Sequence, residues 1–233
     1  MEQEMTICYF HVKREPPSKS HIREENKIKK MVAIALAAIT MFGLPASLST
    51  GASAASITED KVIELEYPDF ISNEDYYRTL AKEEGYILDI EVPEEYADEE
   101  AARIEEMSEN TDAATFDLTR SQAKPTKKWN ILTDGKYNLS AVNNVSVTLY
   151  SQYLFTGWTS YEVSIYNERK DNHDFTVKAY ENKPLFDDLI EDEHTVKPGH
   201  TVIMYVVPSS DTAAWYLKFE GYSTLSGYVA RDI

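Results

Sequence analysis

Three histidines follow residue 55 and are the side chains best suited to proton transfer or metal binding: His173, His194 and His200. None has the spacing of metal ligands on a helix. His194 and His200, however, flank the turn signal Pro198-Gly199, so a β-hairpin there brings the two imidazoles face to face. Such a pair supplies two of the nitrogen ligands that a zinc site uses. The alternative is two solvent-exposed histidines on a hairpin.

A cluster of carboxylates lies just before and beside His194: Asp187, Asp188, Glu191, Asp192 and Glu193. We expect an acidic loop here. Loops with several carboxylates suit Ca²⁺, which takes six to eight oxygen ligands from flexible chain segments. The spacing DxDxDG is absent, and a solvated turn that keeps strand edges from pairing is the alternative. Ca²⁺ is the only cofactor that the composition suggests.

Aromatic residues are concentrated in the second half of the chain. Residues 121–233 hold ten tyrosines and all three tryptophans. Strand periodicity places four of these tyrosines on a predicted outward face: Tyr166, Tyr180, Tyr205 and Tyr216. Exposed aromatic rings stack on sugars or anchor protein interfaces. Alternatively, tyrosines are good strand formers that lie half-buried on the second face of a sheet.

Motifs of enzyme chemistry are missing from the sequence. We find no GxSxG, HExxH, P-loop or dinucleotide fingerprint. The only cysteine is Cys8, so the chain after residue 54 has no thiol nucleophile, thiolate metal site or disulfide. No catalytic residue is assigned, and this favours a protein that is not an enzyme.

The elements that would position these residues begin after an export signal. Lys27, Lys29 and Lys30 precede the apolar run 31–44, and Ala52 and Ala54 form the small-x-small pattern that signal peptidase recognises. The apolar run is shorter than the ~20 residues that a membrane anchor needs. We therefore predict a signal peptide over 27–54, a doubtful leader over 1–26, and a secreted mature protein without a stable membrane anchor.

Charge divides the mature chain. Residues 55–120 carry 21 acidic and 5 basic side chains, whereas residues 121–233 carry 14 and 11. This acidity disfavours nucleic acid and anionic membrane partners. We expect an acidic propeptide or spacer over 55–107 with a weak strand-helix-strand pattern, a linker over 108–128, and an independent domain over 129–233.

The last segment has the alternation of an all-β domain. Six runs alternate apolar and polar residues at period two, and turn chemistry separates them. They span 145–155, 161–167, 175–181, 201–207, 214–219 and 225–230. Short strands at this spacing predict an antiparallel β-sandwich or a small barrel.

A resemblance supports this fold class. The segment 214–219 (AWYLKF), the segment 226–229 (SGYV) and the hairpin 196–199 (VKPG) resemble the closing strands of small secreted β-sandwich domains of Gram-positive bacteria. The likeness covers 137–229 at most. It implies fold and export but no activity.

Two functions therefore stay open. The first is a secreted, non-enzymatic binding module for cell-wall glycan or an extracellular protein. The second is a secreted hydrolase precursor whose acidic segment is removed near Arg120 or Lys127-Lys128.

Overall fold

The structure is a computed structural model that describes residues 56–57, 61–109, 116–117 and 122–232. Among the described residues, strands hold 46% and helices 22%. The chain is thus predominantly β, as the alternating pattern predicts. The predicted signal peptide, with Ala52 and Ala54, lies outside the described residues.

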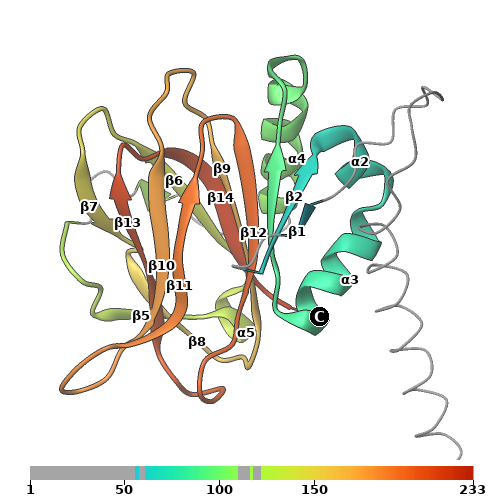
Figure 1. Cartoon of the computed structure of the whole chain (residues 1–233). Coiled ribbons are helices and arrows are strands. Elements are labelled where there is room, and N and C mark those ends of the chain that lie inside the picture. The colour runs from blue at the N-terminus through green and yellow to red at the C-terminus, as the bar shows by residue number, and fades with distance from the viewer. Residues whose placement is uncertain (1–55, 58–60, 110–115, 118–121, 233) are drawn as a thin grey trace, which may run out of the picture. The chain divides into compact units, whose positions relative to one another are not determined.

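A first sheet contains eight strands in the order β1-β2-β3-β12-β9-β14-β6-β4 (Figure 1). Its strands come from both the acidic and the C-terminal parts of the sequence. In chain order they are β1 (Ser56–Ile57), β2 (Val62–Glu66), β3 (Ile87–Glu91), β4 (Phe116–Asp117), β6 (Tyr137–Val142), β9 (Tyr161–Asn167), β12 (His200–Val206) and β14 (Thr224–Arg231).

A second sheet contains six strands, in the order β11-β10-β13-β8-β5 with β7 also paired to β13. These strands are β5 (Lys127–Asn130), β7 (Val147–Tyr150), β8 (Tyr153–Thr156), β10 (Phe175–Glu181), β11 (Asp188–Val196) and β13 (Trp215–Gly221). A single turn of helix, α5 (Ile131–Asp134), follows β5.

Most strand pairs are antiparallel, but three are parallel: β2 with β3, β4 with β6, and β5 with β8. Both sheets are therefore mixed. The antiparallel arrangement was predicted for the C-terminal domain alone, and there it is wrong at β5, which pairs parallel to β8 because α5, β6 and β7 come between them in the chain. The parallel pair of β2 and β3 lies in the acidic part, where helices α2 (Tyr67–Ser72) and α3 (Glu74–Glu84) carry the chain back to the same end of the sheet.

The two sheets share one apolar core. Side chains from β6, β9, β12 and β14 of the first sheet pack with side chains from β8, β10, β11 and β13 of the second. Trp215 is the largest fully buried side chain. Its ring centroid lies 4.9 Å from those of Phe155 and Tyr161. Period-two alternation puts these residues on the facing sides of the sheets.

The acidic part of the chain covers the other face of the first sheet. Besides α2 and α3 it contains η1 (Glu94–Tyr96) and α4 (Ala97–Glu109). Helices α2, α3 and α4 lie on the side of β12 that faces away from β10 and β13 of the second sheet (Figure 1). A second apolar cluster joins Phe70, Leu88 and Ile104 of this part to Ile203 and Tyr205 of β12.

This arrangement differs from the expected division into an acidic propeptide or spacer, a linker and an independent domain. Strand β3 pairs with β12, with Leu88 opposite Ile203, and the described residues after residue 50 form one compact unit. The acidic part has few large apolar side chains of its own, so it buries them by sharing β12 and its outer face. Residues 108–128, the expected linker, include β4 and the start of β5.

Local sequence patterns predicted secondary structure more accurately than they predicted the division into domains. The helix of the expected strand-helix-strand pattern is α3, which ends at Gly85, where the backbone adopts the left-handed conformation (φ 68°). The expected acidic loop over 187–193, in contrast, is largely strand β11. Its backbone pairs with β10, and those ladder hydrogen bonds outweigh the poor strand propensity of Asp and Glu.

Candidate functional site

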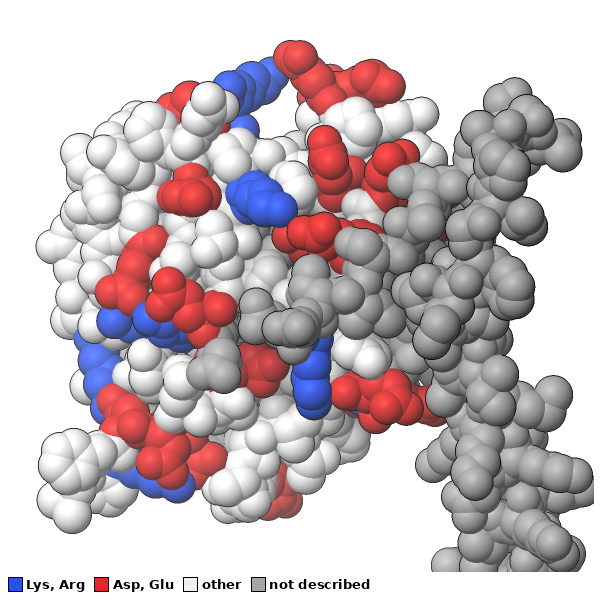
Figure 2. Space-filling model, in the orientation of Figure 1, with Lys and Arg blue, Asp and Glu red and all other residues white. Residues whose placement is uncertain are grey.

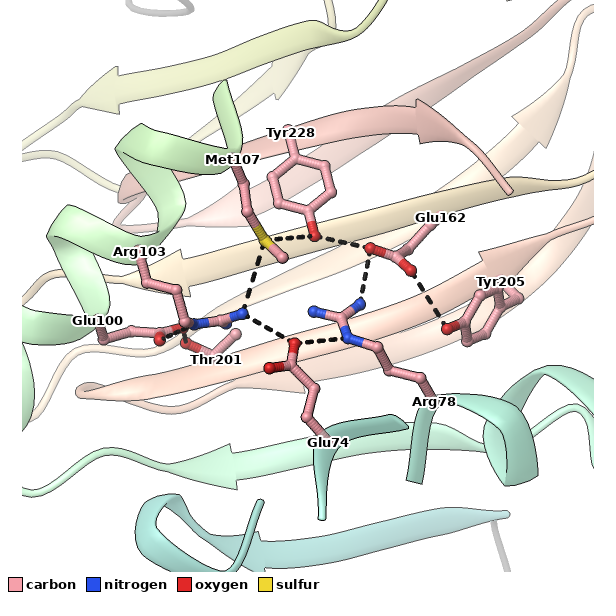
Figure 3. Close-up of polar contacts among 9 residues, drawn as sticks. All are labelled: Glu74, Arg78, Glu100, Arg103, Met107, Glu162, Thr201, Tyr205 and Tyr228. Atoms are coloured by element: carbon pink, nitrogen blue, oxygen red, sulfur yellow. Dashed lines mark hydrogen bonds and ion pairs between the residues drawn. The ribbon is translucent and has the colours of Figure 1, made fainter. Parts of the chain in front are cut away.

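A group of interacting charged and polar side chains lies between the acidic helices and the first sheet. We call it the charge network: Glu74 and Arg78 of α3, Glu100, Arg103 and Met107 of α4, Glu162 of β9, Thr201 and Tyr205 of β12, and Tyr228 of β14. Figure 3 shows these side chains pointing toward one another from helices and strands. The network therefore forms only when the chain is folded.

One half of the network is centred on Arg78. Its Nε lies 2.7 Å from Glu74 Oε1, and its Nη1 lies 2.7 Å from Glu162 Oε1. Glu162 also accepts hydrogen bonds from the hydroxyls of Tyr228 (2.6 Å) and Tyr205 (3.2 Å). One carboxylate thus binds one guanidinium and two phenols (Figure 3).

The other half is centred on Glu100, which is fully buried. Arg103 donates two hydrogen bonds to its carboxylate, at 2.6 and 2.8 Å, and Thr201 Oγ1 donates a third at 2.6 Å. Arg103 Nη1 also lies 3.1 Å from Glu74, which connects the two halves. A fork-shaped arginine contact of this kind fixes both distance and orientation.

The two arginines of the network keep their charges at neutral pH, because the pKa of each is raised. Burial alone would lower the pKa of Arg78, but the carboxylates of Glu162 and Glu74 and the phenol of Tyr228 raise it. Burial, followed by the charge of Glu162, raises the pKa of the Tyr228 hydroxyl well above its usual range. The carboxylates are occupied by arginine, threonine and tyrosine donors, so their chemistry here is to hold the helices on the sheet.

A second polar cluster connects the two sheets. Asp89 of β3 is only 4% exposed. Its carboxylate lies 2.7 Å from His200 Nδ1 and 3.8 Å from both His194 Nε2 and Lys197 Nζ. Lys197 also reaches Glu64 of β2, at 3.6 Å. We call Glu64, Asp89, His194, Lys197 and His200 the Asp89 cluster.

The expectation that His194 and His200 lie near one another is met through this shared carboxylate. Neither imidazole is the exposed hairpin histidine of the alternative reading, since His194 is buried and the side chain of His200 is 15% exposed. Among the described residues, no group of three or more His, Cys, Asp or Glu side chains is arranged to hold a metal ion. The third histidine, His173, lies apart, beside Asp171 and Tyr222.

None of the described carboxylates proposed for Ca²⁺ belongs to a group arranged to hold a metal ion. Asp188 pairs with Lys183, and Glu193 pairs with Lys178. Asp187 accepts hydrogen bonds from Lys124 and Tyr216. Glu191 has a partner of its own, and the side chain of Asp192 is outside the description. Neighbouring side chains of a strand point to opposite faces of the sheet. Calcium binding here stays a prediction, which melting curves with and without calcium would test.

The four tyrosines do not form one exposed face, contrary to the sequence prediction. Tyr166 and Tyr205 are buried under the acidic helices, and Tyr216 is buried on the second sheet. Tyr180 is half-buried and stacks on Tyr216 at 5.6 Å. Two sheets that share a core have outward faces on opposite sides of the molecule, so period two alone could not reveal that the four residues are divided between them.

The connection between β10 and β11 provides the most exposed apolar side chains. Leu185 is 87% exposed and Phe186 is 84% exposed, at the end of a loop that projects away from both sheets (Figure 1). We call residues 183–188 the tip. Sequence reasoning missed it, although two large apolar residues directly after a turn-forming proline were a usable signal.

Polar contacts hold the base of the tip. Asp187 accepts two hydrogen bonds from Lys124 Nζ, at 2.6 and 2.8 Å, and one from the Tyr216 hydroxyl at 2.8 Å. The backbone N–H of Lys183 donates to the same carboxylate at 3.3 Å. Burial opposes ionisation, but Lys124 and Tyr216 lower the pKa of Asp187. The loop is therefore closed by an ionised carboxylate at neutral pH.

The surface around the tip is mixed in charge. Figure 2 shows acidic side chains spread over the visible face, with fewer basic side chains between them. The full chain has a formal net charge of −17.

Comparison with known proteins adds no relative. No protein-family model matches the chain, and no curated protein matches it. Among the described residues, no helix is long and apolar enough to span a membrane.

Proposed function

We propose that this chain is a secreted, non-enzymatic β-sandwich module that binds an extracellular protein through the tip. The observation that carries the proposal is the exposure of Leu185 and Phe186, at 87% and 84%. Burial of a large apolar side chain on binding is worth roughly 1.5–3 kcal/mol. Two adjacent side chains of this kind supply an apolar anchor, and the surface around them must supply the rest of the interface.

The base of the tip supports a binding role. Asp187 draws Lys124, Tyr216 and the Lys183 backbone to one point, and Tyr180 stacks on Tyr216 beside it. A loop that is held in place before binding loses less conformational entropy on association. The contacts thus favour a preformed anchor.

A protein fits the tip better than the other ligand that the sequence suggested. Glycan binding and protein binding were both expected at an open face of tyrosines, and three of the four tyrosines are buried, so neither ligand is argued from that face. The adjacent Leu185 and Phe186 side chains, which are 87% and 84% exposed, suit an apolar pocket of a protein. Because the chain is strongly acidic, a basic rim around that pocket would speed association.

The alternative of a hydrolase precursor is weakened by the packing of the acidic part. Removal of this part would uncover Ile203 and Tyr205 and leave the edge of β12 without β3. An edge strand exposed in this way promotes aggregation. The proposal therefore includes the acidic part in the mature module. Secretion itself rests on the signal peptide predicted over 27–54.

The test is a binding comparison on the mature chain that begins at Ala55. Wild-type protein and the double variant Leu185→Ser/Phe186→Ser are incubated with immobilised extracellular proteins of the producing cell culture and, separately, with purified cell wall. The matched control is Val142→Ser/Val145→Ser, which changes side chains that are 62% and 59% exposed elsewhere. We expect saturable protein binding that only the tip variant loses.

Two further results would separate the possibilities. A photo-crosslinking amino acid at position 186 should join the chain to one defined extracellular protein, and the same group at position 145 should not. Equal protein binding by wild type and the tip variant, or binding to purified wall alone, would contradict the proposal. A secreted form that starts between residues 121 and 129 would favour the precursor instead.

A further inference from the structure

The Asp89 cluster lies where three strands from both sheets converge. Asp89 belongs to β3 and His200 to β12, both in the first sheet, whereas His194 belongs to β11 at the edge of the second sheet. Lys197 lies in the short turn between β11 and β12. The cluster is therefore a polar contact between the sheets beside their shared apolar core.

The geometry leaves one nitrogen without a bond. His200 Nδ1 lies 2.7 Å from one oxygen of Asp89, and Lys197 Nζ lies 3.8 Å from the other. His194 Nε2 is 3.8 Å from that second oxygen, which is too far for a hydrogen bond. The same Nε2 is buried and has no hydrogen-bond partner, and His194 as a whole is only 9% exposed.

We infer that the Asp89 cluster is an acid-sensitive latch between the two sheets. The carboxylate of Asp89 is already shared by Lys197 and the imidazole of His200. Protonation of His194 would add a buried cation beside this one carboxylate. The second carboxylate in reach is Glu64, whose side chain is 48% exposed and contacts Lys197 alone among these cations. Charge that cannot be matched in a buried place is costly.

The sign of the effect follows from His194. Burial lowers the pKa of His194; Asp89 opposes this, and Lys197 and His200 add to the lowering. The unfolded chain takes up this proton near the ordinary histidine pKa of ~6.5, whereas the folded chain does so only at lower pH. Below about pH 6.5 the unfolded state then holds more protons than the folded state. The contribution of His194 to the free energy of unfolding is therefore fully present above about pH 6.5 and is lost as the pH falls below that value.

The latch controls an edge strand. In the second sheet β11 pairs with β10 alone, and on its other side it meets the first sheet at His194. Acid should therefore loosen β11 before it disturbs the central strands, because edge elements open at lower free energy than the core. This inference does not depend on the function of the tip.

The first experiment is the melting temperature of the mature chain between pH 7.5 and 5.5. Wild type should lose melting temperature as the pH falls. The variant His194→Gln, which keeps a polar neutral side chain, should abolish about 3 °C of that loss. The control His173→Gln alters the half-exposed histidine beside Asp171 and should leave the pH dependence unchanged. Equal loss in wild type and His194→Gln would overturn the latch.

A second measurement uses the wild-type protein alone, so it does not depend on whether a variant folds. The imidazole resonances of the wild-type protein are followed by NMR from pH 8 to pH 5. The His194 resonance should titrate below the ordinary histidine value, and backbone signals of β11 should change with the same midpoint. Titration of His194 at or above the ordinary value would overturn the inference.

Discussion

The two faces of the first sheet are covered in different ways. Toward the second sheet, the contact is apolar and aromatic, with Trp215 between Phe155 and Tyr161. Toward the acidic helices, a small apolar cluster around Phe70 is framed by arginines, whose guanidinium carbons lie 5.8 Å (Arg78) and 5.6 Å (Arg103) from its ring. We call the face of the first sheet that packs on the second sheet its dry side, and the face that carries the charge network its charged side.

This difference shows how two kinds of contact divide the tasks of folding. Apolar burial supplies most of the free energy of folding but little orientation. Buried ion pairs offset their desolvation cost only when their geometry is good. The charge network is therefore favourable only when the acidic helices lie in one position on the sheet. Glu100 shows this, because its oxygens are oriented by both Arg103 and Thr201. The dry side stabilises the sheet, and the charged side selects where the acidic part lies.

The largest expected effect comes from removing the acidic part of the chain, which covers the charged side of the first sheet. A chain that starts at Ser121 lacks β1 to β4 and all acidic helices. It would expose the β12 edge together with Ile203 and Tyr205, so we expect aggregation or a loss of several kcal/mol relative to the chain from Ala55. Gel filtration and denaturation followed by tryptophan fluorescence measure this. An unchanged midpoint and slope would mean that the C-terminal strands are an autonomous domain.

A smaller but still large effect is expected from the dry side. Trp215→Ala removes the largest fully buried side chain and should destabilise the protein by about 3–5 kcal/mol, because the neighbouring rings cannot fill the cavity. Circular dichroism in denaturant gives the free energy of unfolding. The control Leu132→Ala alters a side chain that is 53% exposed and should stay within ~0.5 kcal/mol. Similar losses in both variants would deny the difference between core and surface.

The smallest of the three effects is expected within the charge network. Glu162→Gln keeps the shape of the side chain but removes the charge that faces Arg78, Tyr205 and Tyr228. We expect a loss of about 1–3 kcal/mol, since Arg78 keeps Glu74 as a partner. The control Glu193→Gln changes an exposed pair with Lys178 and should cost less than ~1 kcal/mol.

The same variant has a spectroscopic signature. Burial, followed by the charge of Glu162, raises the pKa of the Tyr205 and Tyr228 hydroxyls. Folded wild type therefore holds protons that the unfolded chain releases near pH 10, and stability falls as the pH rises above that value. Ultraviolet absorbance should show tyrosine ionisation at lower pH in Glu162→Gln than in wild type. Identical titration curves would mean that Glu162 does not act on these phenols.

Local sequence patterns predicted local structure well. The runs 161–167 and 175–181 coincide with β9 and β10, because alternation at period two is a property of each strand by itself. The stop of α3 at Gly85 was also predictable. Of the Asp89 cluster, the sequence indicated only the proximity of His194 and His200. The one sequence signal for Asp89 was its position between the apolar residues Leu88 and Ile90.

By itself, the sequence determined that the chain is mainly β, where most strands and the helix over 74–84 lie, and which half is acidic. Only the tertiary structure decided that the acidic half completes the first sheet, that Tyr166 and Tyr205 are buried beneath it, and that Asp89 meets His194 and His200. The physical reason is range. Periodicity and turn chemistry act between neighbours along the chain, whereas strand order and charge pairing join Asp89 to His200 across 111 positions.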